Sequence, residues 1–355
     1  LSSLEKNYLI SLLCVFIGIV FIIKNIILAL FLYFQQNIIK TIKTYISNTL
    51  IKKYLSQNYL FFVNKGISLI TRGIVLDAAN TTIFVLNHIN LLKEFTITIG
   101  IFLLLIFIDP ILSVVILGSL SLVISIYIFY TKNSIYKRGY EINLFSEKVI
   151  NSINQITGSI KDVKLFSSEK YFSNYFGNFL KAAENRVARN NFLSSIPKNL
   201  LELFVIFLIL GILVSYSFLG VEISELIPFI SLFVVSALRL MPGFNNISNS
   251  ILTIKKTKPS FDYILNEYNL LEEKNEEISD NSKIKNMNFK KNIIFKDVRF
   301  KYPNSENYVI DGFNLEIKAG EKLGIVGKSG SGKTTLINLV SGLFKPSNGK
   351  IYIDD

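Results

Sequence analysis

A glycine-rich run near the C-terminus carries the clearest chemistry in this sequence. Residues 327–334 read Gly-Lys-Ser-Gly-Ser-Gly-Lys-Thr and match the pattern G-x-x-x-x-G-K-[ST]. Glycines in such a run let successive backbone N–H groups turn inward around phosphate oxygens. The pattern assigns the Lys333 ammonium to the β- and γ-phosphates of a nucleoside triphosphate and the Thr334 hydroxyl to Mg²⁺. The predicted site for a nucleoside triphosphate and Mg²⁺ consists of Gly327, Lys328, Ser329, Gly330, Ser331, Gly332, Lys333, Thr334 and Thr335.

The segments on both sides of this run are those that a phosphate loop needs. Residues 322–326 predict a short buried strand that enters the loop, and residues 334–340 predict a helix that leaves it. Ser341-Gly342 would end that helix. A helix that begins at the loop presents the positive end of its dipole to bound phosphates. The alternative, a Gly/Ser-rich turn without a ligand, leaves this strand-loop-helix order unexplained.

The composition indicates an integral membrane protein. Hydrophobic residues make up 50% of the 355 residues, 29 are phenylalanine and none is tryptophan, and the mean hydropathy is +0.42. The single cysteine, Cys14, leaves no partner for a disulfide or a zinc site within the chain. The net charge of +12 comes from residues that flank hydrophobic stretches, so we predict no nucleic-acid binding.

Hydrophobic stretches of the length needed to cross a bilayer, about 20 residues, recur along the first part of the chain. They cover residues 8–34, 95–108, 111–130, 200–219 and 226–240. Asp109-Pro110 forms a tight turn between the second and third stretches, and Pro197 stands where it could open the helix of the fourth.

The distribution of charge predicts the orientation of these spans. Residues 35–90 and 131–199 are rich in lysine and arginine. In the two short connections between spans the only charged residues are acidic, Asp109 in one and Glu222 and Glu225 in the other. Positively charged segments remain in the cytoplasm, so the nucleotide segment after the fifth span would be cytoplasmic too. Five spans would leave Leu1 outside the cell, and we therefore expect one more span before it.

The residues around the phosphate loop resemble those of an ATP-binding-cassette (ABC) domain. The resemblance rests on a strand at residues 293–303 that ends in Tyr302-Pro303, a strand at 309–317, Ala319-Gly320-Glu321, the loop itself, Gly342-Leu343-Phe344-Lys345-Pro346, Gly349 and Ile353-Asp354. It implies that the Tyr302 ring stacks on adenine. The alternative is an edge-strand tyrosine that contacts no ligand.

The same resemblance implies a glutamine loop, a signature motif, an Asp-Glu pair and a switch histidine after the phosphate loop. None of them follows Thr335, and the only histidine, His88, lies far upstream, where we expect a surface or interface position. We therefore expect this sequence to be a fragment that lacks the first span and most of the cassette, and that does not hydrolyse ATP by itself.

Nearly the whole sequence is similar to an exporter-type ABC half-transporter, in which six long helices precede one cassette. The resemblance implies an all-α polytopic membrane domain at residues 1–258 with five of the six helices, a linker at 259–291, and the N-terminal part of an α/β P-loop nucleotide-binding domain at 292–355. Residues 59–83 and 158–172 fall where such transporters carry transverse coupling helices. Ordinary cytoplasmic helices are the alternative there.

Three basic residues in or beside the predicted spans are candidates for cargo recognition. They are Lys24, Lys198 and Arg239. A lysine at the centre of a span costs about 3 kcal/mol, which its apolar neighbours can offset. Snorkelling, or an ion pair such as Lys198–Glu202, therefore remains an alternative to function. In the functional interpretation the three cations line a cavity for an anionic phosphate or pyrophosphate head group.

Two short segments, Gly-Ser-Ile-Lys-Asp-Val-Lys at 158–164 and Ala-Leu-Arg-Leu-Met-Pro at 237–242, are similar to bacterial flippases for lipid-linked oligosaccharides. Arginine is usual in that family at the positions of Lys24 and Lys198, and lysine lacks its planar two-pronged contact with phosphate. The resemblance implies a homodimer that flips an anionic lipid-linked oligosaccharide across the bacterial inner membrane, with its nucleotide domain in the cytoplasm. The alternatives are an exporter of peptides, drugs or other lipids and, in another class, a membrane-tethered P-loop kinase or ATP-sensing regulatory protein.

Overall fold

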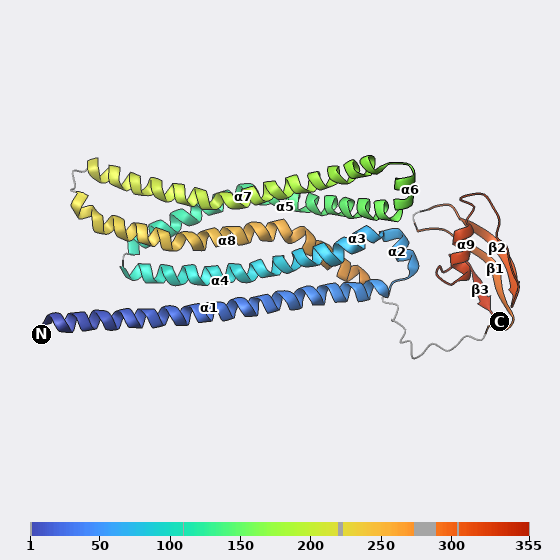
Figure 1. Ribbon diagram of the computed structural model, residues 1–355, viewed down its shortest axis with the longest axis horizontal. Helices are drawn as coiled ribbons and strands as arrows, with labels where there is room; N and C mark the ends of the chain where they lie inside the picture. Colours follow the sequence, from blue (N-terminus) through green and yellow to red (C-terminus); the bar gives the residue numbers. More distant parts are fainter. Residues whose placement is uncertain (1, 109, 219–222, 273–288, 304, 355) are drawn as a thin grey trace. The chain divides into compact units, whose positions relative to one another are not determined.

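The computed structural model describes residues 2–108, 110–218, 223–272, 289–303 and 305–354. Its elements are α1 (Ser2–Leu55), α2 (Tyr59–Lys65), α3 (Ile67–Arg72), the π-helical segment η1 (Gly73–Asp77), α4 (Ala78–Ile108), α5 (Pro110–Gly158), α6 (Ile160–Leu165), α7 (Glu169–Phe218), α8 (Ile223–Glu272), β1 (Asn292–Phe300), β2 (Ile310–Lys318), α9 (Lys333–Val340) and β3 (Asn348–Ile353) (Figure 1). The chain divides into two compact units, one of Leu1–Leu50 with Ser68–Glu267 and one of Ile51–Ile67 with Tyr268–Asp355.

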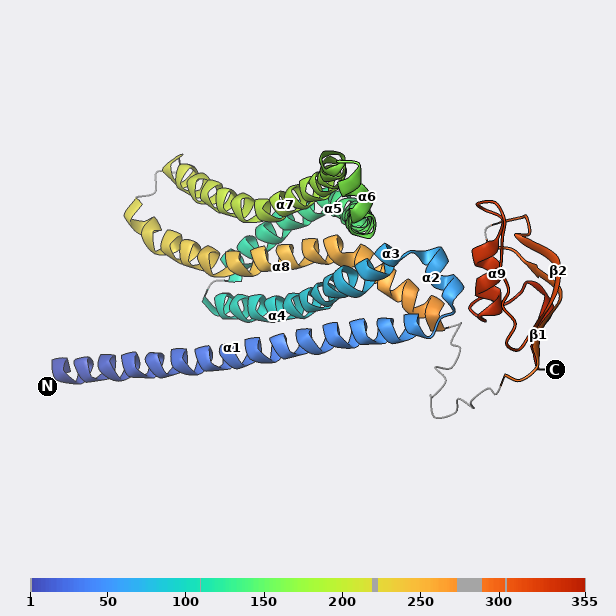
Figure 2. The same cartoon turned by 45° about the vertical axis from the view of Figure 1, so that its right-hand side comes forward.

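The first unit is a bundle of long helices. In both views α4, α5, α7 and α8 run side by side along their length (Figures 1 and 2). Apolar residues that recur every three or four positions bring α5, α7 and α8 together in one core. The fully or nearly fully buried members are Ile116, Leu120, Ile124, Leu201, Val205, Phe233, Ala237, Leu240 and Phe244.

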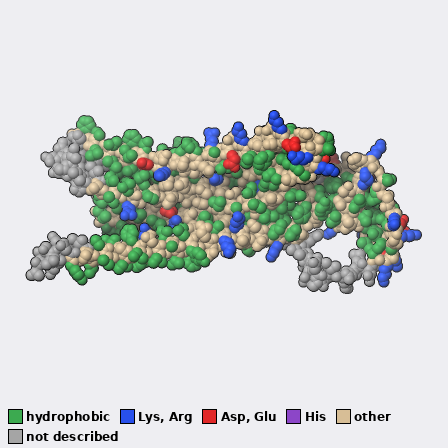
Figure 3. Space-filling view, viewed as in Figure 1, with side chains coloured by type: hydrophobic (Ala, Val, Ile, Leu, Met, Phe, Trp, Pro, Cys, Tyr) green, Lys and Arg blue, Asp and Glu red, His purple; other side chains and the backbone are tan. Residues whose placement is uncertain are grey.

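Four helical segments among the described residues are long and apolar enough to cross a membrane, namely Ser11–Leu55, Ile67–Ile108, Ser113–Gly158 and Glu169–Ser215. They overlap the first four predicted spans, at residues 8–34, 95–108, 111–130 and 200–219. The fifth predicted span, residues 226–240, lies on α8. The side chains of its first residues are outside those that the structure describes, so this span stays a prediction. Hydrophobic side chains dominate the end of this unit that holds the α4–α5 turn, and lysine and arginine are more frequent toward the end that holds α6 (Figure 3). This distribution is the one expected of helices that continue from a bilayer into water.

The two segments predicted to hold coupling helices each contain a short helix, α2 in the first and α6 in the second. Asn58 caps α2, because its side chain accepts a hydrogen bond from the backbone N–H of Phe61 at 3.0 Å, and Gly66 ends it with a φ of 79°. The second segment contains the six-residue helix α6. The short helices thus lie where the coupling helices were expected, but their role remains a prediction.

Two expectations about helix ends are corrected. Pro197 does not open a helix but lies inside α7, which continues through it for 50 residues in all. A proline removes only one backbone hydrogen bond, and Pro197 itself is buried, so the helix continues through it. In addition, α8 extends to Glu272, through the first residues of the segment expected to be a linker. Leu271 is 2% exposed there, so packing extends the helix. The remainder of the expected linker, residues 273–288, lies outside the described residues.

A buried ionic cluster holds α3, η1 and α5 together. The Arg72 Nε lies 2.9 Å from Asp77 Oδ2, and Arg72 Nη1 lies 2.8 Å from Glu147 Oε2. The Arg72 guanidinium also lies 4.6 Å from the centre of the Tyr263 ring, which α8 contributes. The side chains of Arg72 and Asp77 are only 6% and 1% exposed, so this pair is desolvated.

The close approach of α5 to α8 requires a glycine at position 139. A Cβ atom added there would contact the backbone carbonyl of Lys256. We expect Gly139→Ala to destabilise the protein by about 1–3 kcal/mol, because a backbone carbonyl cannot move aside without shifting the helix. Gly177→Ala is the matched control, since a Cβ at Gly177 meets nothing within 4 Å, and alanine favours a helix. Thermal unfolding followed by circular dichroism would measure both variants, and equal midpoints would contradict the close approach.

The second unit contains a three-stranded antiparallel sheet in the order β2-β1-β3. Its core includes Phe295, Val298, Phe300 and Ile310 from the strands and Leu336, Leu339 and Phe344 from α9 and the segment after it. The strands β1 and β2 and the helix α9 confirm predicted elements around the loop. The predicted buried strand at residues 322–326 is wrong, because no described strand pairs with it. Its side chains are exposed, with Val326 at 93%.

Candidate functional site

The phosphate loop has the backbone conformation that its sequence predicts. Gly330 and Gly332 have φ values of 82° and 85°, in the left-handed region that favours glycine. Gly332 is the N-cap of α9, so the loop leads directly into the first turn of that helix. The Ser331 N–H donates to the Lys328 carbonyl at 3.2 Å and closes the turn. The loop therefore presents backbone N–H groups next to a helix N-terminus, which is an anion-binding arrangement.

Gly332 has a steric as well as a conformational reason to be glycine. A Cβ atom added to it would lie 3.1 Å from Val309 Cγ1 and 3.2 Å from Ile310 Cδ1. Such contacts are tighter than ordinary van der Waals distances. The start of α9 is thus held against the segment that begins β2, and this packing fixes the direction of the helix.

Lys333 and Thr334 lie in the first turn of α9. The Lys333 ammonium donates to the carbonyls of Gly327 at 2.8 Å and Lys328 at 2.7 Å, so it lies over the loop. Thr334 is exposed at the first turn of α9. Across the described parts of the chain, no group of three or more His, Cys, Asp or Glu residues could hold a metal ion. The Thr334 hydroxyl is an oxygen donor, the type of ligand that Mg²⁺ prefers, so this residue fits the predicted role.

Tyr302 lies beside the helix that follows the loop. Its hydroxyl is 3.1 Å from the Thr335 hydroxyl, and Thr335 is buried. Its ring packs edge-to-face against Phe300 and Phe344, with centroid distances of 5.2 and 5.9 Å. The ring is thus held in place and half-buried. Stacking on adenine by this side chain remains a prediction.

Helix α2 belongs to the same compact unit as the sheet and the loop. The Tyr59 ring stacks on the Phe344 ring with a centroid distance of 5.7 Å and an interplanar angle of 29°. Leu60 packs against the apolar core that includes Phe300 and Leu336. Phe344 in turn stacks on Phe300 at 5.0 Å, so rings connect α2 to the sheet that carries the loop. A coupling role for α2 remains a prediction.

The three cations predicted to recognise cargo lie on different helices. Lys24 is exposed on α1, Lys198 on α7 and Arg239 on α8. No hydrogen bond or ion pair within the described residues joins any two of them, and none joins Lys198 to Glu202. The Lys24 ammonium lies 5.4 Å from the Phe21 ring on its own helix. A shared cavity for the three thus remains a prediction, whereas His88 is exposed as expected.

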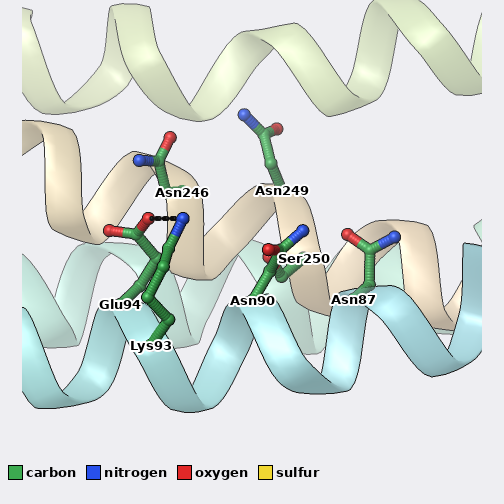
Figure 4. Close-up of a pocket in the computed structure, with 7 residues that line it drawn as sticks. All are labelled: Asn87, Asn90, Lys93, Glu94, Asn246, Asn249 and Ser250. Carbon is green, nitrogen blue, oxygen red and sulfur yellow. Dashed lines mark ion pairs between the residues drawn. The ribbon is translucent and has the colours of Figure 1, made fainter. Parts of the chain in front are cut away.

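The sequence interpretation missed a polar pocket between α4 and α8. Its volume is about 290 Å³. The lining side chains are Asn87, Asn90, Lys93 and Glu94 on α4 and Asn246, Asn249 and Ser250 on α8 (Figure 4). These residues recur at three- and four-residue intervals on each helix, so each set lies on one helix face. The sequence shows this polar spacing, but either face alone resembles a solvated helix surface, so it did not indicate that the two faces meet.

The fold and the loop together define a membrane protein that carries a P-loop nucleotide site. The family model described as "ABC transporter" matches residues 310–355. The chain is 24% identical over 278 residues to an "ATP-dependent lipid A-core flippase" of Wigglesworthia glossinidia brevipalpis, which covers 75% of this chain and 45% of the relative. It is 48% identical over 63 residues to "Alpha-hemolysin translocation ATP-binding protein HlyB" of Escherichia coli, over 18% of this chain and 9% of that one. It is 55% identical over 58 residues to "ABC transporter B family member 29, chloroplastic" of Arabidopsis thaliana, over 16% and 9% of the two chains.

These similarities and the fold fit an exporter-type ABC half-transporter. The predicted fold class is confirmed, since an all-α membrane domain is followed by an ABC nucleotide-binding region. The chain spans less than half the length of the relatives described above, 45% of the flippase and 9% of each of the other two.

Proposed function

We propose that this chain belongs to an ATP-driven exporter that flips an anionic lipid-linked oligosaccharide from the inner to the outer leaflet of a bacterial inner membrane. The observation that carries the proposal is the phosphate loop at the start of α9, on the same chain as four membrane-capable helices. In this arrangement the free energy of nucleotide binding is available to a membrane bundle. A second copy of the chain would complete the transporter as a homodimer.

The residues of the loop would hold ATP and Mg²⁺ as follows. Backbone N–H groups of residues 327–335 and the N-terminus of α9 surround the phosphates. The Lys333 ammonium exchanges its contacts with the loop carbonyls for contacts with phosphate oxygens. Thr334 supplies a hydroxyl ligand to Mg²⁺, and the Tyr302 ring takes the adenine. When bound, Mg²⁺ supplies the positive charge that phosphoryl transfer requires.

A lipid cargo is better supported than a peptide cargo. The flippase relative is similar over 278 residues, which is more than the part of the chain after α8 can hold, so the similarity includes the membrane helices. The relative named for α-hemolysin translocation is similar over only 63 residues. Cargo contacts lie in the membrane domain of a transporter, so the longer similarity is the more informative one for cargo.

In the proposed transporter Arg239 binds the anionic head group. Its side chain is exposed near the end of the apolar stretch of α8. We expect Arg239→Ala in the full-length protein to lower the flipping of a fluorescent lipid-linked oligosaccharide in liposomes at least about tenfold, the size of effect expected when a charge-assisted hydrogen bond is lost. Basal ATP hydrolysis should remain, since Arg239 is distant in sequence from the loop.

Arg189→Ala is the matched control, because Arg189 is an exposed arginine on α7 outside the apolar stretch. It should flip the lipid like the unmodified protein. Undiminished flipping by Arg239→Ala would count against the cationic cavity. Efficient export of a peptide, without flipping of the glycolipid by the unmodified protein, would favour the peptide-exporter alternative.

A further inference from the structure

The polar pocket between α4 and α8 is a bounded space in the helical unit. At one end Thr98 and Gly243 are in contact, since a Cβ added to Gly243 would lie 2.5 Å from Thr98 Oγ1. At the other end the rings of Phe84 and Phe261 stack at 4.5 Å with an interplanar angle of 14°. Between these contacts the two helices line a partly open pocket of about 290 Å³. This volume is at the lower end of the range for small-molecule sites, about 300–1,000 Å³, and suits one or two rings of a small ligand.

The charges of the residues that line the pocket sum to zero. Lys93 Nζ and Glu94 Oε1 form an ion pair at 3.1 Å, which Figure 4 marks with a dashed line. The other lining side chains are four amides and one hydroxyl. A phosphate or pyrophosphate would have to displace Glu94, whose side chain is 10% exposed, from its cation. A second cation is absent from the lining residues, so the pocket does not suit an anion.

Its hydrogen-bonding groups instead match a ligand that both donates and accepts. Each asparagine carries one acceptor oxygen and one donor NH₂ group. The Asn90 oxygen accepts from Gln35 Nε2 at 2.7 Å, which leaves its NH₂ group as a donor. The Asn87 NH₂ group donates to the Ile83 carbonyl at 2.8 Å, which leaves its oxygen as an acceptor. A hydroxyl group both donates and accepts hydrogen bonds, so the hydroxyl groups of a sugar can use both kinds of partner.

The position of the pocket along the two helices can be compared with the apolar stretches of those helices. On α4 the pocket ends at Glu94, and the apolar stretch of residues 95–108 begins at the next residue. On α8 the pocket starts at Asn246, shortly after the apolar stretch that ends at Leu240. The pocket is thus at the boundary between apolar and polar surface, which is the level of lipid head groups.

We propose that this pocket binds the uncharged sugar part of a glycolipid head group, while the anionic part of the same head group is left to cations elsewhere. For its biological meaning this inference rests on the proposed flipping of a lipid-linked oligosaccharide. Its physical content is independent of transport: the α4–α8 pocket prefers a neutral polyhydroxylated group on an alkyl chain to an anionic group on the same chain.

The test uses two photoreactive probes and the full-length protein in lipid nanodiscs. One probe is dodecyl maltoside with a diazirine in the alkyl chain next to the sugar, and the other is dodecyl phosphate with the same diazirine. Mass spectrometry would map the labelled peptides. We expect the maltoside probe to label residues 87–94 and 246–250 saturably, with competition by unlabelled dodecyl maltoside, and the phosphate probe to label them at least about tenfold less.

Variants of similar size test the named side chains. Asn246→Leu combined with Asn249→Leu should lower the maltoside labelling about tenfold, because the amides lose their hydrogen bonds while the volume is retained. Asn185→Leu is the control, since Asn185 is exposed on α7 and lies outside the pocket. Retained labelling of the loop by azido-ATP would show that each variant is folded.

Three results would overturn the inference: no saturable maltoside labelling of the pocket, stronger labelling by dodecyl phosphate, or an equal loss in the Asn185→Leu control. If maltoside labelling fails while azido-ATP labels the loop, the pocket assignment is wrong and the proposed function stands. If maltoside labelling succeeds while azido-ATP fails to label the loop, the proposed function is wrong and the pocket assignment stands.

Discussion

Lys333→Ala will lower the ATP hydrolysis of the full-length protein at least about 100-fold, the loss that follows removal of one positioned charge from a developing transition state. The Lys333 ammonium now lies over the loop, 2.8 and 2.7 Å from the carbonyls of Gly327 and Lys328. From there it reaches any phosphate held by the backbone N–H groups. Its removal deletes these two contacts and, in the proposed site, the charge assigned to the β- and γ-phosphates. Phosphate release from ATP in nanodiscs, at saturating Mg²⁺, measures the effect.

Lys350→Ala serves as the control for this variant. Lys350 is an exposed lysine on β3 in the same unit, and it makes no contact with the loop. Its hydrolysis rate should stay within about twofold of the unmodified rate, as expected of a surface substitution away from the site. If Lys333→Ala retained more than about a tenth of the activity while Lys350→Ala was normal, the assignment of the loop would be wrong.

Arg72→Leu will destabilise the protein by about 3–5 kcal/mol, the cost of leaving a buried charge without its partner. Arg72 and Asp77 are 6% and 1% exposed, and the distance between Arg72 Nε and Asp77 Oδ2 is 2.9 Å. Leucine would fill part of the space but leave the buried Asp77 carboxylate without its cation. The midpoint of thermal unfolding should fall by about 10 °C. Circular dichroism of the purified protein in detergent checks this value.

Two further variants separate the charge effect from simple loss of packing. Arg72→Leu combined with Asp77→Asn removes both charges and should recover part of the lost stability. Lys164→Ala breaks the ion pair of Lys164 with Glu169, whose side chains are 67% and 48% exposed, and should change the midpoint by no more than about 2 °C. Equal effects of Arg72→Leu and Lys164→Ala would contradict the importance of the buried pair.

Local chemistry explains which parts of the site could be predicted from the sequence. The phosphate loop has a pattern in which each residue has a backbone or charge role, and the structure confirms the loop conformation at Gly330 and Gly332. The helix after the loop followed from its apolar periodicity. The strand expected at residues 322–326 did not form, because a buried strand depends on neighbours that the segment itself does not encode.

Tertiary contacts explain what the sequence did not reveal. The Arg72 cluster combines residues from three helices, and the α4–α8 pocket combines two polar helix faces separated by more than 150 residues. Each face alone looks like a solvated cytoplasmic stripe. Pro197 was expected at the start of a helix, although packing along α7 carries the helix past it. Pairing of distant faces therefore had to come from the structure.

The most direct test of the central claim is the sidedness of nucleotide labelling at the loop. Membrane vesicles containing the full-length protein would be prepared in inside-out and right-side-out orientation and exposed to azido-ATP with Mg²⁺. The proposed function predicts labelling within residues 327–335 in inside-out vesicles, where the cytoplasmic face is accessible, and none in sealed right-side-out vesicles. Labelling of the loop only in right-side-out vesicles, or its absence from both, would contradict an ATP site that drives transport from the cytoplasm.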